Sequence, residues 1–198
     1  MSTQASRKLI NISSLVSLLA IISLTIYWWQ MGLFSSQTAM QSYVAHLQLL
    51  GPLIFIVIQI VQVVIPIIPG GISTAVGVVL FGPLWGFVYN YIGIVTGSFI
   101  NFFLARYYGK SFILHVIPKK VYNRYIDRTK NQKAFDWFFA AAIFFPVAPD
   151  DVLVLMAGLT KMSWQKFSAI IIFLKPFTIA AYSFILLYGS QWLLQWFK

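Results

Sequence analysis

Two proline tetrads interrupt the apolar stretches of this chain at positions 80 residues apart. The first, Pro66-Ile-Ile-Pro69, is followed by Gly70-Gly71, and the second, Pro146-Val-Ala-Pro149, is followed by Asp150-Asp151. Because proline lacks a backbone N–H and clashes with the preceding turn, it breaks a helix that would otherwise continue. After each tetrad a short apolar segment ends at a glycine, which is Gly158 in the second case. Each apolar stretch is therefore predicted to break and turn at its tetrad.

The composition indicates that lipid surrounds most of the chain. Of the 198 residues, 60% are hydrophobic and 9% are charged, whereas about a quarter of an ordinary soluble domain is charged. A net charge of +10 would suggest nucleic acid in a soluble protein. In a membrane protein, retained Lys and Arg orient the chain and meet anionic lipid, and no basic stripe with an exposed aromatic code accompanies the charge. We therefore expect an all-α integral membrane protein that binds no nucleic acid.

Residues 1–48 are predicted to hold an N-terminal transmembrane helix and an outer loop. Arg7 and Lys8 precede an apolar run over residues 9–32, which is long enough to cross a bilayer. The run ends in the aromatic residues 27–29 and not in the small-residue cleavage site of a signal peptide. The helix is therefore expected to remain in the protein, with its N-terminus in the cytoplasm.

Residues 50–82 are predicted to form a re-entrant hairpin, because the apolar segment after the first tetrad is too short to span a bilayer at about 1.5 Å per residue. Irregular backbone at membrane depth persists only where protein or a wet cavity surrounds it. Pro83 then opens a helix over residues 83–105. Three glycines on this helix allow a neighbouring helix to approach closely: Gly86, Gly93 and Gly97.

The segment 106–133 is the main polar part of the chain. It holds eight of the 14 basic residues and one acidic residue, Asp127, so the positive-inside rule assigns it to the cytoplasm. After Pro118, four apolar residues fall on one face of a predicted helix: Val121, Tyr122, Tyr125 and Ile126. This pattern is typical of a helix that lies on an anionic membrane surface. Lipid recognition and a plain topology signal both account for the charge.

Residues 135–160 are predicted to form a second re-entrant hairpin that enters from the cytoplasmic side. Read as one straight span, this segment would hold its two adjacent Asp residues near the bilayer centre, where each acidic residue costs about 2.5–3.5 kcal/mol. A hairpin puts both carboxylates at a tip that faces protein or water. A helix over residues 167–189, interrupted at Lys175-Pro176, and an interfacial tail over residues 191–198 complete the chain.

The two hairpin-plus-helix units enter from opposite sides, and together they predict an inverted repeat over residues 49–190. Broken apolar segments at corresponding positions of two halves are the sequence feature that best indicates the binding site of a transporter. The functional site is therefore expected where the two hairpin tips meet.

Two stretches of the chain resemble a known family. PGGISTAVGVVLFGPLWGFVYNYIGIVTGSFINFFLARYYGK, from Pro69, and FFPVAPDDVLVLMAGLTKMSWQKF, from Phe144, are similar to the two halves of the SNARE-associated Golgi protein family, or VTT domain, of the DedA superfamily. An Arg-x-x-Gly, Arg106 to Gly109, lies between them. The resemblance covers residues 50–190 and implies two facing re-entrant hairpins in an inverted repeat.

The resemblance also implies lipid handling. Bacterial relatives are linked to the recycling of undecaprenyl phosphate and other lipids, some driven by the proton gradient, and eukaryotic relatives behave as phospholipid scramblases. This chain departs from the family pattern at Gly70-Gly71, where DedA relatives often have an acidic residue, and at Lys175, where an Arg is often seen. Proton coupling through paired acids would therefore depend on the second hairpin alone.

Four residues are candidates for a substrate or proton pathway: Asp150, Asp151, Arg106 and Lys175. One Asp is expected to cap the following helix and the other to titrate or to order a head group. Lys175 needs a partner in an apolar helix, and a hairpin Asp is the natural one, unless the lysine lies near the cytoplasmic interface. A guanidinium suits phosphate binding, although snorkelling also explains Arg106. The remaining motif residues are expected to shape the hairpins: Pro66, Pro69, Gly70, Gly71, Pro146, Pro149 and Gly158.

The leading hypothesis is a transporter or scramblase that moves phospholipid or polyprenyl phosphate across a membrane, most simply the bacterial plasma membrane. Its partners would be anionic or phosphate-bearing lipids, with no cofactor and no metal. One alternative is a non-catalytic scaffold or assembly factor that forms a homo-oligomer through its glycine-rich helix. A lipid-phosphate enzyme is less favoured, because two adjacent acids without further Asp or His make no metal site. His46 and His115 are expected at the surface.

Overall fold

The computed structural model describes these parts of the chain: residue 30 and residues 36–65, 70–145 and 149–196. The chain divides into two compact units, Met1–Leu47 and Gln48–Lys198. In the first unit the described residues include α2 (Gln37–His46), whose last residue is exposed. The predicted N-terminal transmembrane helix falls, apart from residue 30, outside the described residues. So do Pro66, Pro69 and Pro146.

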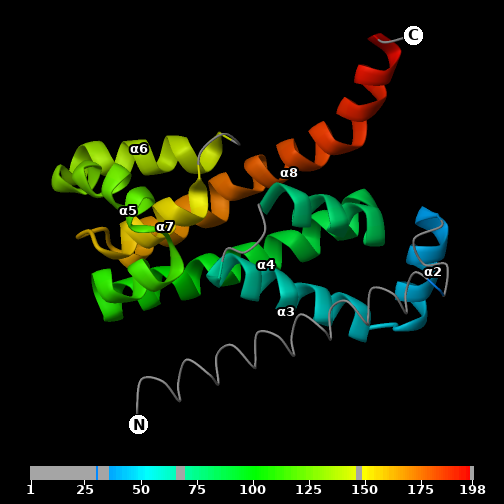
Figure 1. Cartoon of the computed structure of the whole chain (residues 1–198), viewed down its shortest axis with the longest axis horizontal. Coiled ribbons are helices and arrows are strands. Elements are labelled where there is room, and N and C mark those ends of the chain that lie inside the picture. Colours follow the sequence, from blue (N-terminus) through cyan, green and yellow to red (C-terminus); the bar gives the residue numbers. More distant parts are fainter. Residues whose placement is uncertain (1–29, 31–35, 66–69, 146–148, 197–198) are drawn as a thin grey trace. The chain divides into compact units, whose positions relative to one another are not determined.

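The secondary structure of the described part of the second unit is helical throughout (Figure 1). Its elements, in chain order, are α3 (Leu50–Val64), α4 (Gly70–Val116), α5 (Lys119–Ile126), the 3₁₀ helix η1 (Asp127–Lys130), α6 (Gln132–Phe144), α7 (Asp150–Gly158) and α8 (Trp164–Trp196). Two stretches, Ser73–Val116 and Trp164–Ile185, are long and apolar enough to cross a membrane. The all-α class predicted from the sequence is therefore confirmed.

Glycine breaks α4 into three pieces. Gly82 has φ 79° and Gly109 has φ 64°, a left-handed conformation that residues with a side chain rarely adopt. Pro83 follows the first break, where a missing N–H is tolerated at a helix start. In contrast, α8 continues as one helix through Pro176, so the interruption predicted there is wrong. Neighbouring helices allow a proline inside a membrane helix.

Small residues let the first half of the unit pack closely. A Cβ on Gly97 would lie 2.7 Å from the Cβ of Val63, which seats α3 against the second piece of α4. A Cβ on Gly86 would lie 2.5 Å from the carbonyl oxygen of Gly77, so the first piece of α4 folds back on the second. Gly93 is buried against α3 in the same way. The chain's own helices fill this glycine face, which corrects the expectation that it is free to hold a second copy.

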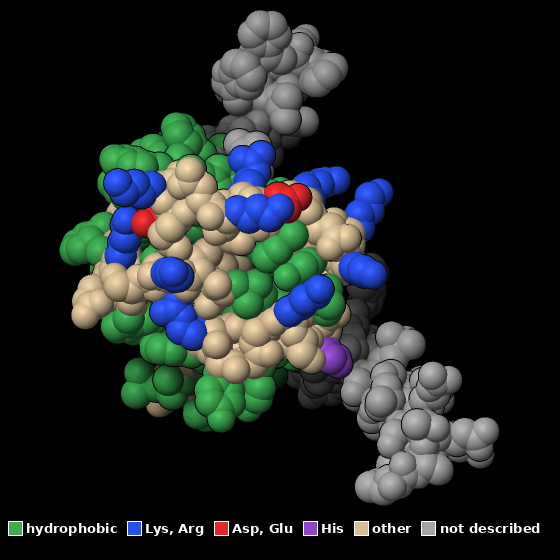
Figure 2. Space-filling view, turned by 90° about the vertical axis from the view of Figure 1, so that its left-hand side faces the viewer, with side chains coloured by type: hydrophobic (Ala, Val, Ile, Leu, Met, Phe, Trp, Pro, Cys, Tyr) green, Lys and Arg blue, Asp and Glu red, His purple; other side chains and the backbone are tan. Residues whose placement is uncertain are grey.

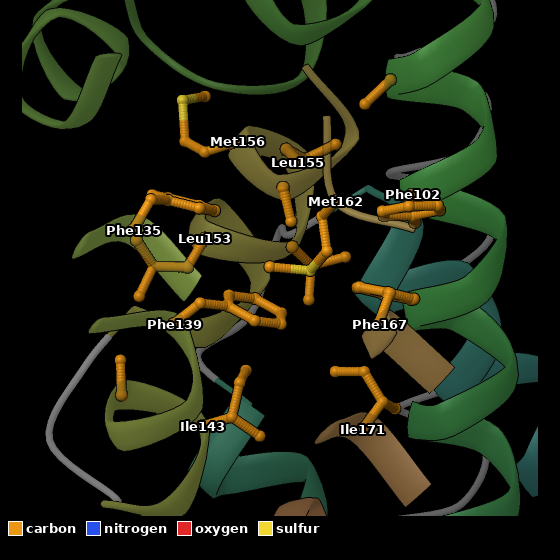
Figure 3. Packing of buried hydrophobic residues seen from close by; sticks show 14 of the residues in the cluster. Phe102, Phe135, Phe139, Ile143, Leu153, Leu155, Met156, Met162, Phe167 and Ile171 are labelled. Carbon is orange, nitrogen blue, oxygen red and sulfur yellow. The ribbon is translucent and has the colours of Figure 1, made fainter. Parts of the chain in front are cut away.

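The second half packs α6, α7 and α8 with α4 around one apolar core (Figure 3). The ring of Phe167 on α8 stacks on Phe102 of α4, with centroids 3.9 Å apart, and on Phe139 of α6 at 5.8 Å. Every residue of α7 from Leu153 to Gly158 is buried. A helix too short to span a bilayer is thus surrounded by protein, which satisfies the requirement for irregular backbone at membrane depth.

The apolar face of α5 is turned toward the protein. Tyr122 is buried, and Val121, Tyr125 and Ile126 pack against the apolar core. The opposite face exposes basic side chains such as Arg124. An amphipathic pattern fits a protein partner as well as a lipid one. The expectation that this face lies on a membrane surface is therefore corrected.

Candidate functional site

Lys175 lies in a buried charged cluster at the junction of three helices. The lysine, on α8, is 1% exposed. Its Nζ is 3.2 Å from Asp150 Oδ2 and 3.7 Å from Asp151 Oδ1, both on α7. The ion pair predicted between Lys175 and the Asp residues after the second tetrad is present.

The two carboxylates belong to the first turn of α7. The N-cap position is occupied by Pro149, and no side chain caps the helix, so the expectation of an Asp N-cap is wrong. Asp150 Oδ1 instead accepts a hydrogen bond from the backbone N–H of Asp151, at 3.0 Å. Carboxylates in a first turn are stabilised by the partial positive charge of the helix N-terminus. This field and the ammonium group together allow two adjacent acids inside the protein.

Ser98 of α4 is the third partner of Lys175. Lys175 Nζ donates to Ser98 Oγ at 3.0 Å, while the Ser98 hydroxyl donates to the carbonyl oxygen of Ile94 at 2.8 Å. The ammonium group is therefore surrounded by one hydroxyl acceptor and two carboxylates. Ser98 therefore ties the charged residues of α7 and α8 to the long helix of the first half.

Tyr182 brings the start of α4 next to the charged cluster. A Cβ on Gly71, two residues after the first tetrad, would lie 3.4 Å from the Tyr182 ring. Tyr182 lies on α8. It follows Lys175 by two helical turns on α8, so both side chains share one face. Residues that follow the first and the second tetrad therefore meet at this face of α8.

Arg106, the fourth predicted site residue, is bound at the opposite end of α7. Its Nε donates to the carbonyl oxygen of Gly158 at 3.2 Å, and its Nη2 donates to those of Thr160 and Met162 at 2.9 and 2.8 Å. The guanidinium also lies 4.2 Å from the ring centroid of Phe102. A cation at a helix C-terminus satisfies orphan carbonyls and opposes their partial charge. Arg106 thus holds the C-terminus of α7 and does not join the Lys175 cluster.

The glycines that were expected to shape the hairpins lie at different helix contacts and helix ends. A Cβ on Gly158 would lie 2.6 Å from the Cβ of Ala105, so α7 can approach α4 only with glycine here. Gly70 opens α4, and Gly71 contacts Tyr182 as described.

His115 is exposed, as expected, with a ring nitrogen 2.6 Å from a backbone oxygen of its own helix.

A second polar cluster lies between α3 and α4. Gln59 donates to Asn90 Oδ1, and Asn90 Nδ2 donates to the carbonyl oxygen of Thr74 at 2.9 Å. Asn101 Nδ2 donates to the carbonyl oxygen of Val63 at 2.7 Å. Among the described residues, the side-chain oxygens of Gln59 and Asn101 are buried without a hydrogen-bond partner. Buried acceptors of this kind suit water or a donor on a ligand.

Sequence reasoning missed three polar residues. Ser98 and Tyr182 carry no signal of their own, because serine and tyrosine are common in membrane helices. Asp136 is different: it is 8% exposed, pairs with Lys166 and accepts from Gln132 Nε2 at 2.6 Å. An acidic residue at the start of an apolar helix could have been recognised as needing a cation. Within the described ranges, no group of three His, Cys, Asp or Glu side chains could hold a metal ion.

Comparison with known proteins agrees with the motifs. The VTT domain family matches residues 68–187. The uncharacterized membrane protein YhjE of Bacillus subtilis (strain 168) is 26% identical over 127 residues, which is 64% of this chain and 59% of YhjE, so the match leaves about two fifths of that relative uncovered. No solved structure matches the chain. With a family match over more than half of its length and two apolar helices that can cross a membrane, the chain belongs to the VTT domain family of membrane proteins, the DedA and SNARE-associated Golgi family.

Proposed function

We propose that this protein moves lipids across a bilayer as a transporter or scramblase and is not an enzyme. The observation that carries the proposal is the pairing of buried Lys175 with half-buried Asp150 and Asp151 between helices of an apolar bundle. Ionisable residues within membrane segments are expensive, so their presence favours a role on a substrate or proton path. The substrate class is a phospholipid or a polyprenyl phosphate.

The charge balance of the cluster bears on how it would act. Two carboxylates face one ammonium, so the cluster is negative by one charge when both acids are ionised and neutral when one is protonated. Lys175 is held by a hydrogen bond to Ser98 and by ion pairs with both acids, and Arg106 is engaged elsewhere. A head group would therefore enter by exchanging with one of these partners. The buried, unpartnered oxygens of Gln59 and Asn101 form a separate polar group in the first half.

We also infer that the two halves form an inverted repeat of re-entrant hairpins, with the basic segment in the cytoplasm. The support is a bond that recurs at the same place in each half. The carbonyl oxygen of Val63, three residues before the first tetrad, accepts from Asn101 of α4. The carbonyl oxygen of Ile143, three residues before the second tetrad, accepts from Thr178 of α8. Each long helix thus satisfies a carbonyl left open where a hairpin helix ends.

The test is lipid flip in proteoliposomes. The full chain is reconstituted with fluorescent phosphatidyl lipids or an undecaprenyl phosphate probe, with and without a pH gradient. The Asp150→Asn, Asp151→Asn double variant is expected to lose flip. The matched control is Asp127→Asn, which removes an exposed acid paired with Lys130 at 2.6 Å and is expected to keep it.

Each result has a distinct meaning. Flip without a gradient identifies a scramblase, and flip that requires the gradient identifies proton-driven transport. An unchanged rate in the double variant would exclude the acids from the path. Absence of flip for every probe, with folded protein, would reject lipid movement and favour the scaffold.

A further inference from the structure

Basic side chains gather at one end of the second unit, where α4 ends and α6 and α8 begin. Figure 2 views this end, and Lys and Arg side chains are spread over it with few acidic side chains between them. Eight of the 14 basic residues lie in residues 106–133, and Lys161 and Lys166 lie at the start of α8 or just before it. The two acids in this region, Asp127 and Asp136, already have lysine partners. The end therefore carries a large uncompensated positive charge.

Contacts between helices put the start of α6 and the start of α8 at one level. The backbone N–H of Lys161 donates to Gln132 Oε1 at 2.9 Å. The centroid of the Trp164 ring lies 4.4 Å from that of the Phe103 ring on α4. Large aromatic side chains are exposed in this layer: Trp137 81%, Tyr107 80%, Tyr108 59% and Trp164 37%. Exposed tryptophan and tyrosine beside basic residues are typical of the level of lipid head groups.

Along one face of α6, the exposed side chains change from charged to apolar across this layer. Lys133, Trp137 and Ala141 are exposed and four residues apart, so they lie on one face. Phe144 and Phe145 continue the exposed surface at the C-terminal end of the helix. The face thus passes from a charge, through an indole, to apolar side chains. This is the order in which a bilayer changes from head group to hydrocarbon.

Three cations lie on or beside the first two turns of α6. Lys133 lies in the first turn of α6, Lys161 is bonded to that turn through its backbone, and the Arg128 guanidinium lies 4.5 Å from the Phe138 ring. None of the three has a carboxylate partner among the described residues. The N-terminus of α6 adds a partial positive charge. Phosphate oxygens fit such a group of donors.

We propose that Arg128, Lys133, Lys161 and Trp137 form a docking surface for the head groups of anionic phospholipids in the leaflet at this end. The cations bind the phosphate, and the indole lies against the glycerol region of the same lipid. A soluble acidic partner would fit the charges but would leave the apolar continuation at Phe144 uncovered. This lipid is a bound component of the protein, separate from any lipid that moves past Lys175.

The test is native mass spectrometry of the full chain in detergent with equal amounts of phosphatidylcholine and phosphatidylglycerol. The wild-type chain is expected to retain phosphatidylglycerol preferentially. Each of Arg128→Gln, Lys133→Gln and Lys161→Gln is expected to lower that preference about fivefold, the effect of one cation near an anionic surface. The comparison variant neutralises three cations on the outer face of α5, Lys119→Gln, Lys120→Gln and Arg124→Gln. Because these cations lie outside the proposed group, it is expected to lower the preference less than each of the single changes.

Two outcomes would overturn the proposal. One is that all three single variants prefer phosphatidylglycerol as strongly as the wild type does. The other is displacement of phosphatidylglycerol by polyglutamate, which would assign the surface to a soluble acidic partner. A second measurement uses the absence of cysteine from the chain. A spin label at Trp137→Cys in vesicles is expected to be relaxed more by oxygen than by a water-soluble nickel complex, and the reverse order would also reject the assignment.

Discussion

Replacing Lys175 by methionine would remove the cation that contacts both acids of the cluster. Methionine is similar in length and apolar, so the change leaves the volume filled and deletes the charge. Breaking a buried ion pair by removing one partner costs about 3–5 kcal/mol. The Asp150 and Asp151 side chains keep 26% and 22% exposure, so the protein encloses the two acids only in part. We therefore expect a loss near the lower limit, about 3 kcal/mol.

The expected loss is large enough to measure. For a chain of this length, 1 kcal/mol lowers the unfolding midpoint by about 2–4 °C, so Lys175→Met should unfold about 6–12 °C below the wild type. The assay is thermal unfolding in detergent, followed by tryptophan fluorescence. The triple variant with Asp150→Asn and Asp151→Asn removes every charge of the cluster. It should recover most of the loss, because uncharged groups of similar shape need no ionic partner.

Comparing the two variants tests whether the loss of stability comes from unpaired charges. Ser98 remains in both and cannot account for a difference between them. If Lys175→Met unfolds at the wild-type temperature, the ion pairs contribute little to stability. If the triple variant is no more stable than the single one, the loss comes from packing and not from unpaired carboxylates. Either result would refute the electrostatic account of the cluster.

Three further changes test other contacts. Gly158→Ala should cost about 1–3 kcal/mol by overpacking, seen as a lower unfolding midpoint, because α7 and α4 must separate; a midpoint equal to the wild type would mean that the helices part freely. Arg106→Lys cannot reach three carbonyl groups at once, so hydrogen exchange of the amides after Gly158 should become faster, while unchanged exchange would deny the capping role. Asp136→Asn removes a partly exposed pair and should change stability by about 1 kcal/mol or less; a loss comparable to that of Lys175→Met would show that the pair is more strongly coupled than its exposure indicates.

Parts of this architecture could be predicted from local chemistry. Gly82-Pro83 indicates a helix break because one residue tolerates a positive φ and the next lacks an N–H. The pairing of Lys175 with the hairpin acids could be predicted because a lone charge in an apolar helix requires a partner. In both cases the physical requirement of a residue left few alternatives.

Other features depend on long-range packing and could not be predicted. Arg106 is separated from Gly158 by 52 residues, and no local pattern indicates that it caps α7 in place of binding phosphate. The same limit applies to α5, since its apolar face suits a membrane as well as a protein core. Ser98 gains its role only from the position of Lys175 on another helix. Spacing identifies which residues need partners but does not identify the partner when several are available.

The separation of the cluster along the chain has a consequence for biogenesis. Lys175 is synthesised 24 residues after Asp151, so the two acids are made before their counter-ion. An unpaired acid inside a bilayer costs about 2.5–3.5 kcal/mol. The segment containing α7 is therefore unfavourable in the bilayer during synthesis and becomes favourable when α8 delivers its lysine. Stable insertion of α7 therefore depends on α8, and the two helices are expected to enter the bilayer together.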